Sequence, residues 1–293
     1  MPLTRPWENR QMAWIGEERQ VIHHYTSVAA LAAILHSGRL RFTRLDRFDD
    51  VLEAQTVAGI DFGAQLFASC WVKQDAEDIA QWSMYGDTKQ GVRISLPDDP
   101  FAWQLLNAFH QVPGTNAKWH FDNAEAPFPL DEVFGDGYLL LPVIDRSRFL
   151  KEVLYVDDVV QAYRRHVRHD GETIVIDGYP TELARYKWNR WAFQREHRFV
   201  LTTVRGPRRT EDPAEYGECY HELVRDPLWH RQGALSPYID LKFAPSALQD
   251  MIVTIGPLCS DAGREEVGRL CARYAPCARI RMSELQGKIR PKA

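Results

Sequence analysis

The sequence has few cysteines, no long apolar run and no excess of one charge, and each absence excludes a class of protein. Five cysteines in 293 residues, with no Cys-x-x-Cys pair, argue against a disulfide scaffold. No run approaches the ~20 apolar residues that cross a bilayer. Residues 1–7 lack the apolar centre of a signal peptide. The sequence therefore predicts a cytoplasmic protein that does not enter a membrane.

Charge and missing motifs narrow the function further. The 36 basic and 40 acidic residues give a formal net charge of −4, which is too balanced for a nucleic-acid coat or a polybasic membrane binder. The sequence contains no phosphate-binding loop, no dinucleotide-binding glycine motif, no His-Glu-x-x-His and no Gly-x-Ser-x-Gly. These absences argue against kinases, P-loop and Rossmann enzymes and serine hydrolases, and no metal site is expected.

No repeat, low-complexity tract or Gly/Ser linker divides the chain, so we expect a single domain over residues 1–293. Its core blocks are expected at about residues 21–96 and 186–275. Between them lies an irregular insertion of short helices and loops at about 97–180, rich in proline near its start. A helix is expected in this insertion at about 151–168.

The first core block alternates short β-type runs with helical segments. A helix capped by Thr26 or Ser27 and stopped by Gly38 follows the first run, and another helix is expected at 77–85. The β-type runs predict four strands, at residues 21–25, 39–43, 66–72 and 91–96.

The last block repeats this pattern. Residues 191–201 alternate apolar and polar side chains, which predicts a strand with Gln194, Glu196 and Arg198 on one face. A further strand at 251–255 leads to a helix. The chain as a whole therefore predicts a mixed α+β fold with short strands.

Three polar residues stand at unusual places in these apolar elements. His24 lies at the end of a strand, just before a helix N-terminus, where ligands often bind; a core histidine satisfied by the backbone is the alternative. Glu196 lies in a half-buried strand, where a carboxylate is either paired, with Arg195 or Arg198, or used in function. Tyr85 ends a helix, and its ring packs in the core or stacks on a flat ligand.

These residues stand in blocks that together resemble the bacterial domain-of-unknown-function family 2971. The departures from the family's Phe-Asn-Asp-Pro-Phe-Glu segment are Asp49, Val51 and Leu52. The last block contains Lys187, Trp191 and the run FQREHR, similar to the family's Lys-x-x-x-Trp-x-Tyr-Glu-x-Glu-x-Arg. The matches span about residues 22–200, with a looser match near residues 252–256, and the stretch between residues 96 and 186 is unmatched.

That family in turn is similar to ADP-ribosyltransferases of the His-Tyr-Glu type. The resemblance implies a split, mixed or antiparallel β-sheet core flanked by helices. It also implies that His24 binds a ribose hydroxyl of NAD, that Tyr85 stacks on the nicotinamide, and that Glu196 stabilises positive charge as the glycosidic bond breaks.

The same resemblance implies further contacts with NAD and with an acceptor. Gln194 would orient the acceptor; many relatives have Glu there, so Gln194 argues against arginine and leaves amide or nucleobase acceptors open. Arg41 or Arg44 would meet the pyrophosphate, with solvated arginines as the alternative. The implied NAD-binding set is completed by Tyr25, Thr26, Ser69 and Trp82.

We therefore expect an NAD-dependent ADP-ribosyltransferase-like enzyme that acts on an unknown protein or nucleic-acid acceptor. Toxins and defence effectors occur among proteins with such folds, so we expect a role of this kind. We also expect an inhibitory partner that restrains the enzyme. Two alternatives stay open: an NAD glycohydrolase that transfers to water, and a non-catalytic module that binds a nucleotide or nucleic acid on the same scaffold.

Overall fold

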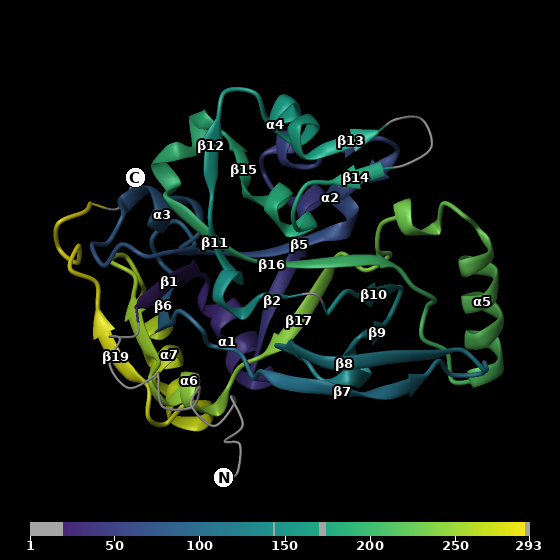
Figure 1. Ribbon diagram of the computed structural model, residues 1–293. Helices are drawn as coiled ribbons and strands as arrows, with labels where there is room; N and C mark the ends of the chain where they lie inside the picture. Colours follow the sequence, from purple (N-terminus) through teal and green to yellow (C-terminus); the bar gives the residue numbers. More distant parts are fainter. Residues whose placement is uncertain (1–19, 143, 170–173, 291–293) are drawn as a thin grey trace, which may run out of the picture.

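The computed structural model describes residues 20–142, 144–169 and 174–290 (Figure 1). Residues 1–7, on which the expectation of no signal peptide rests, lie outside the described residues. The described chain has an α+β fold, as predicted, with a multistranded, mostly antiparallel sheet and several helices. Among these residues, no helix has both the length and the apolar character needed to cross a membrane.

In the part of the chain that the structure describes, the main sheet contains eleven strands in the order β19-β18-β6-β1-β5-β16-β10-β9, with β11 on β16 and the β2–β17 pair on β5. Each pairing in this sheet is antiparallel except that of β18 with β19. The strands are β1 (Val21–Thr26), β2 (Arg39–Arg44), β5 (Leu66–Val72), β6 (Val92–Pro97), β9 (Phe134–Gly135), β10 (Tyr138–Leu140), β11 (Leu150–Glu152), β16 (Glu196–Arg205), β17 (Tyr238–Lys242), β18 (Ile252–Ile255) and β19 (Arg279–Met282).

Helices and small two-stranded sheets surround the main sheet (Figure 1). The α-helices are α1 (Val28–Ser37), α2 (Phe62–Gln65), α3 (Ile79–Met84), α4 (Val159–His166), α5 (Pro213–Arg225), α6 (Pro245–Gln249) and α7 (Asp261–Tyr274). The 3₁₀ turns are η1 (Leu45–Arg47), η2 (Val51–Glu53), η3 (Leu130–Glu132), η4 (Arg146–Arg148), η5 (Pro180–Arg185), η6 (Asn189–Gln194) and η7 (Trp229–Arg231). The paired short strands are β3 (Thr56–Val57) with β4 (Ile60–Asp61), β7 (Gln104–Gln111) with β8 (Lys118–Ala126), β12 (Leu154–Val156) with β15 (Tyr186–Trp188), and β13 (Val167–His169) with β14 (Ile174–Ile176).

The β1–α1–β2 unit confirms the local signals in the sequence. The Ser27 hydroxyl caps α1 by accepting a hydrogen bond from the backbone N–H of Ala30 at 3.0 Å. Gly38 ends the helix with φ +63°, in the left-handed region that favours glycine. The chain is therefore turned directly from α1 into β2.

The two faces of the sheet are buried by different layers. On one face, Leu31 and Leu35 of α1 and Val267 and Leu270 of α7 pack in a cluster with Ile22 and Phe67 of the sheet. On the other face, α2, α4 and η5 cover side chains of β5 and β16 in a second cluster. Because strand side chains alternate, Glu196 and Arg198 of β16 share this second face with Val200.

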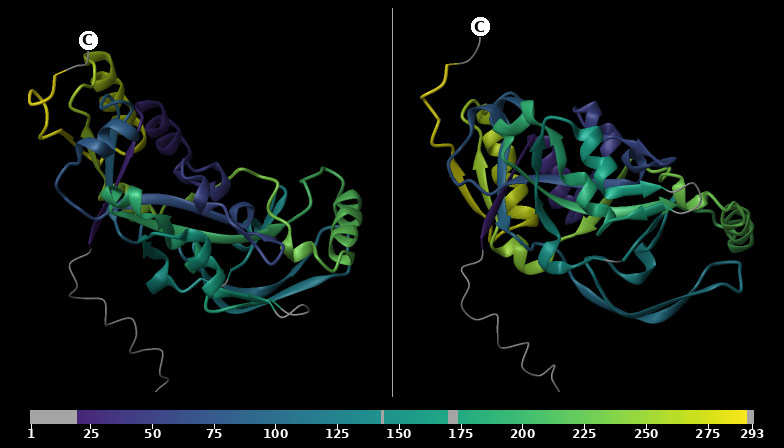
Figure 2. Two further views of the ribbon diagram at one scale, coloured as in Figure 1. Left: turned by 90° about the horizontal axis from the view of Figure 1, so that it is seen from above. Right: turned by 45° about the horizontal axis from the view of Figure 1, so that its top comes forward.

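The middle of the chain is more regular than predicted. Besides the short helices η3, η4 and α4, it contains a long hairpin of β7 and β8 that lies with α5 at one end of the molecule (Figure 2). The prolines do not interrupt it because Pro97, Pro113 and Pro127 stand outside its strands. Strands β9, β10 and β11, also from the predicted insertion, join the main sheet on the β16 side.

Two predicted elements are shorter than expected. The helix predicted at 151–168 begins only after Asp158, which caps α4, because residues 150–156 pair in strands β11 and β12. The strand predicted at 191–201 begins only at Glu196. The preceding segment is the 3₁₀ turn η6, which ends at Arg195 with φ +47°, so Gln194 does not belong to the strand face of Glu196.

Two glycines give a matched test of the packing at β6. A Cβ atom on Gly91 would lie 2.1 Å from the backbone oxygen of Thr26, whereas one on Gly268 in α7 meets nothing within 4 Å. We expect Gly91→Ala to destabilise the fold by about 1–3 kcal/mol and Gly268→Ala to stabilise it by up to about 1 kcal/mol. Urea unfolding measures both, and equal midpoints for the two variants would contradict this packing.

Candidate functional site

The main sheet is interrupted along one edge of its central strand, β5. The other edge pairs with β16 from Leu66 to Val72. On the interrupted edge, β1 pairs with β5 at Val72, and β2 pairs with it at Ala68 and Phe67. β1 and β2 then separate, β1 pairing with β6 and β2 with β17. In the described structure, residues 69–71 of β5 therefore face a gap between β1 and β2.

A cavity of about 260 Å³ opens at this gap. Residues from β1, β2 and β5 line it together with residues from η1, α3, β15 and the start of β16. The lining residues are His23, His24, Tyr25, Arg41, Thr43, Arg47, Phe48, Asp49, Ala68, Ser69, Cys70, Trp71, Val72, Gln81, Tyr85, Lys187, Gln194 and Glu196.

The His24 ring spans the gap from β1 to β5. Its Nδ1 lies 2.8 Å from the backbone oxygen of Cys70. A carbonyl oxygen only accepts, so Nδ1 must carry the proton. Burial lowers the pKa of His24, which keeps the ring neutral at pH 7 despite this hydrogen bond. The neutral ring then presents the lone pair of Nε2 as a hydrogen-bond acceptor.

Tyr85 and Gln194 meet at another side of the cavity. The Gln194 Nε2 donates to the Tyr85 hydroxyl at 2.6 Å, and Gln81 Nε2 donates to the backbone oxygen of Gln194 at 3.0 Å. These bonds connect α3 to η6. Burial and the nearby charge of Glu196 raise the pKa of Tyr85, so its hydroxyl stays protonated. Tyr85 is 37% exposed, whereas Gln194 is 2% exposed.

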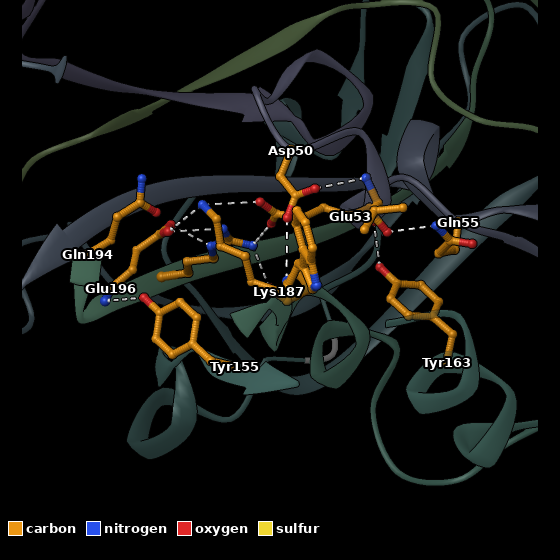
Figure 3. Close-up of polar contacts among 12 residues, drawn as sticks. Asp50, Glu53, Gln55, Tyr155, Tyr163, Lys187, Gln194 and Glu196 are labelled. Atoms are coloured by element: carbon orange, nitrogen blue, oxygen red, sulfur yellow. Dashed lines mark hydrogen bonds and ion pairs between the residues drawn. The ribbon is translucent and has the colours of Figure 1, made fainter. Parts of the chain in front are cut away.

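Glu196 belongs to a buried network of two acids and two bases (Figure 3). Arg198 donates from Nε to Glu196 Oε1 at 2.6 Å and from Nη2 to Oε2 at 3.1 Å. Lys187 Nζ lies 3.0 Å from Glu196 Oε2 and 3.2 Å from Glu53 Oε1. Arg198 Nη1 completes the network by binding Glu53 Oε2 and the backbone oxygen of Ala184.

The pairing decides the charge state of Glu196. Burial alone would raise the pKa of this carboxyl, but the Arg198 guanidinium and the Lys187 ammonium outweigh burial and hold the pKa well below its usual range. Burial likewise opposes the charge of Lys187, and the two glutamates raise its pKa above the ordinary value. Glu196, Lys187 and Arg198 are therefore ionised at neutral pH.

Backbone hydrogen bonds fix both ends of this network (Figure 3). The N–H of Glu196 donates to the Tyr155 hydroxyl at 2.9 Å, and the Tyr163 hydroxyl donates to the backbone oxygen of Glu53 at 2.9 Å. Asp50 accepts from the N–H of Leu52 at 3.0 Å, which caps the η2 turn that contains Glu53. The acidic residues are thus held in place by segments far apart in the sequence.

The gap brings together seven of the ten residues that the sequence analysis assigned to NAD or its acceptor. Those lining the cavity are His24, Tyr25, Arg41, Ser69, Tyr85, Gln194 and Glu196. The other three lie outside the lining. Thr26 pairs with Val92 in β6, Trp82 is fully buried against Tyr25, and Arg44 binds Asp46 and the backbone oxygen of Ala234.

Three charged residues at the site had no assigned role. Glu53 and Lys187 stand in the segments that carry the family resemblance, but only the folded chain shows that they pair with Arg198 and Glu196. Arg47 lines the cavity and, among the described residues, has no carboxylate within ion-pair distance. By contrast, Arg41 is bound to Asp240 at 2.9 Å and 3.1 Å. A pattern of charges alone does not distinguish these arginines.

Among the described residues, no group of three or more His, Cys, Asp or Glu side chains is arranged to hold a metal ion. Comparison of the chain with protein-family models, with curated proteins and with solved structures finds no match.

Loss of the Arg198 charge should reduce the stability of the buried network strongly. Arg198→Met leaves two buried carboxylates with one cation, and we expect a loss of about 3–5 kcal/mol in the free energy of unfolding. Arg190→Met is the matched control because Arg190 is exposed, and we expect it to change stability by less than about 1 kcal/mol. Guanidinium denaturation compares them, and equal losses would contradict a network that depends on Arg198.

Low pH should weaken the contribution of Glu196 to the free energy of unfolding. Its folded pKa is lowered from 4.5 to about 2, so its stabilising effect is complete above 4.5 and is lost as the pH falls towards 2. We expect the difference in the free energy of unfolding between the wild type and Glu196→Gln to shrink between about pH 5 and about pH 3. Denaturation at several pH values measures this difference, and a difference independent of pH would contradict an ionised Glu196.

Proposed function

We propose that this chain is an NAD-dependent ADP-ribosyltransferase-like enzyme of the His-Tyr-Glu type. The proposal is carried by one observation: His24, Tyr85 and Glu196, from three separate parts of the sequence, line one cavity at the gap in the sheet. The reaction breaks the bond between nicotinamide and ribose and transfers ADP-ribose to an acceptor.

The cavity suits the nicotinamide–ribose end of NAD. Its volume of about 260 Å³ is slightly below the roughly 300–1,000 Å³ typical of small-molecule sites, so it takes part of a dinucleotide rather than the whole. The exposed Tyr85 ring offers a face for stacking on nicotinamide. The Nε2 lone pair of His24 can accept a hydrogen bond from a ribose hydroxyl.

The basic residues of the cavity suit the pyrophosphate. Arg47 is the cation for this role because its guanidinium has no carboxylate partner among the described residues. Arg41 would first have to leave Asp240. Arg44, the other arginine expected at the pyrophosphate, binds Asp46 and does not line the cavity.

Glu196 keeps the capacity to act on a ribose. A carboxylate has about four places for hydrogen-bond donors. Three are filled, two by Arg198 and one by Lys187, and the Cys70 thiol is a further, weak donor. A ribose 2′-hydroxyl is a stronger donor than a thiol and can replace it. The ionised carboxylate would then stabilise the oxocarbenium-like charge that develops at the anomeric carbon.

One observation favours a second candidate, a nucleotide-binding module without catalysis. Glu196 already has both oxygens bound to cations, and Arg198 is completely buried, which is the arrangement of a structural ion pair. In that case His24 and Tyr85 bind a ligand, whereas Glu196 only holds β15 and β16 together.

Release of nicotinamide from NAD by the purified protein separates the two candidates. We expect release by the wild type and a loss of roughly 10²–10³-fold in Glu196→Gln, because the anomeric charge loses its stabilising partner. Glu125→Gln, an exposed glutamate on β8, is the matched control and should keep the wild-type rate.

Tyr85→Ala tests the site without disturbing the buried network. Loss of the stacking face should raise the KM for NAD by about 2- to 10-fold. Circular dichroism of each variant checks that it folds. If the wild type binds NAD but releases no nicotinamide, the enzyme proposal is wrong and the binding module is supported.

A further inference from the structure

The segment leading to Gln194 carries aromatic and basic side chains in alternation. It reads KWNRWAFQR over residues 187–195 and forms the end of β15, the turn η6 and Arg195. Trp188 is 38% exposed and Phe193 is 46% exposed. The Arg190 guanidinium lies over the Trp188 ring at 5.8 Å, and the Trp191 and Phe193 rings lie 6.2 Å apart. Exposed rings with cations beside them are the elements of a stacking surface for nucleic-acid bases.

The side chain of Gln194, which follows Phe193 in this segment, has an unsatisfied polar atom at the cavity. Gln194 is 2% exposed, and its Nε2 is engaged with the Tyr85 hydroxyl. Its Oε1 is buried and has no hydrogen-bond partner among the described residues. A buried amide oxygen without a donor is unfavourable, so a ligand that brings an N–H group to this place gains a hydrogen bond.

The charges around the segment favour an anionic partner. Arg47 at the cavity and Arg190 and Arg195 on the segment have no carboxylate within ion-pair distance among the described residues. Two carboxylates line the cavity: Glu196 is neutralised by Lys187 and Arg198, and Asp49 is exposed. A cationic acceptor such as an arginine or lysine side chain is therefore disfavoured relative to a phosphate-linked strand.

Building on the proposed function, we propose that the acceptor is a base in a single-stranded nucleic acid. Neighbouring bases stack on Trp188 and Phe193, and the target base donates an N–H hydrogen bond to Gln194 Oε1. A single strand is required because the bases of a duplex have their faces stacked and their N–H groups paired. Arg190 and Arg195 contact the phosphates of the strand.

The transfer is balanced in atoms and charge. The bond from the anomeric carbon to nicotinamide breaks, and nicotinamide leaves with the electron pair as a neutral molecule. The anomeric carbon forms a new bond to the base nitrogen that carried the N–H. That nitrogen loses one proton to water. The products are an ADP-ribosylated base, nicotinamide and one proton.

The experiment uses the full chain, NAD labelled on its adenylate phosphate, and oligonucleotides of about twelve nucleotides, within the range of single-strand binding sites. Homopolymers of the four bases, a duplex and an abasic strand are incubated in parallel, and nicotinamide release is followed in the same samples. We expect label on at least one homopolymer, and none on the duplex or the abasic strand. Label on the abasic strand, or equal label on duplex and single strand, overturns the proposal.

Binding of the same strands, followed by fluorescence anisotropy, tests the stacking surface separately. Trp188→Ala and Phe193→Ala should each weaken single-strand binding about tenfold or more, because each removes a stacking contact. Phe109→Ala is the matched control: Phe109 is 68% exposed on the β7–β8 hairpin, and its loss should leave binding unchanged. Equal effects of the three variants overturn the stacking surface.

The two proposals fail in different ways. Nicotinamide release that depends on Glu196, with no label on any oligonucleotide, overturns the nucleic-acid acceptor and leaves the proposed cleavage of NAD standing. If no nicotinamide is released from NAD, either with any of the strands or with no strand present, the transferase proposal is wrong. Transfer to bases is then overturned with it. Thermal unfolding of each variant shows whether a loss reflects misfolding.

Discussion

The site depends on a group of four charges that no part of the chain could bury alone. Arg198 has no exposed surface, and a lone guanidinium there would cost far more than one salt bridge returns. Glu53, Lys187 and Glu196 reach it from η2, β15 and β16, so the charges are compensated only when these three segments have assembled. This wall of the cavity therefore exists only in the assembled fold.

The gap beside β5 is the second constraint, because it leaves a cavity that Lys187 and Glu196 of this group line. A continuous sheet would have filled this edge with backbone hydrogen bonds. Because β1 and β2 separate, the carbonyl of Cys70 is bound instead by the His24 ring, which sets the protonation of that ring. The gap thus fixes the protonation of His24, while the ion pairs fix the charge of Glu196.

Local signals in the sequence predicted local structure well. Ser27 and Gly38 mark both ends of α1, and the strands at 66–72 and 251–255 form close to their predicted bounds. The errors lie where long-range contacts decide. The left-handed Arg195 shortens a strand whose alternation looked continuous, and pairing with β16 turns part of a predicted helix into β11.

The candidate site was predictable only in part, for the same reason. His24, Tyr85 and Glu196 come from the order of sequence blocks, but the partners Glu53 and Lys187 come from contacts across 145 and 9 residues of sequence. No local pattern distinguishes Arg47, which lines the cavity, from Arg44, which does not. The geometry of the site is a property of the sheet pairing rather than of any one segment.

The strands beside the gap, β1 and β2, are joined by α1 alone, a helix of 10 residues or about 15 Å. This helix joins the two branches of the sheet and packs on the face opposite to that of Glu196 and Arg198. None of the residues that line the cavity belongs to α1. A change in this helix therefore reaches the site only through the positions of β1 and β2.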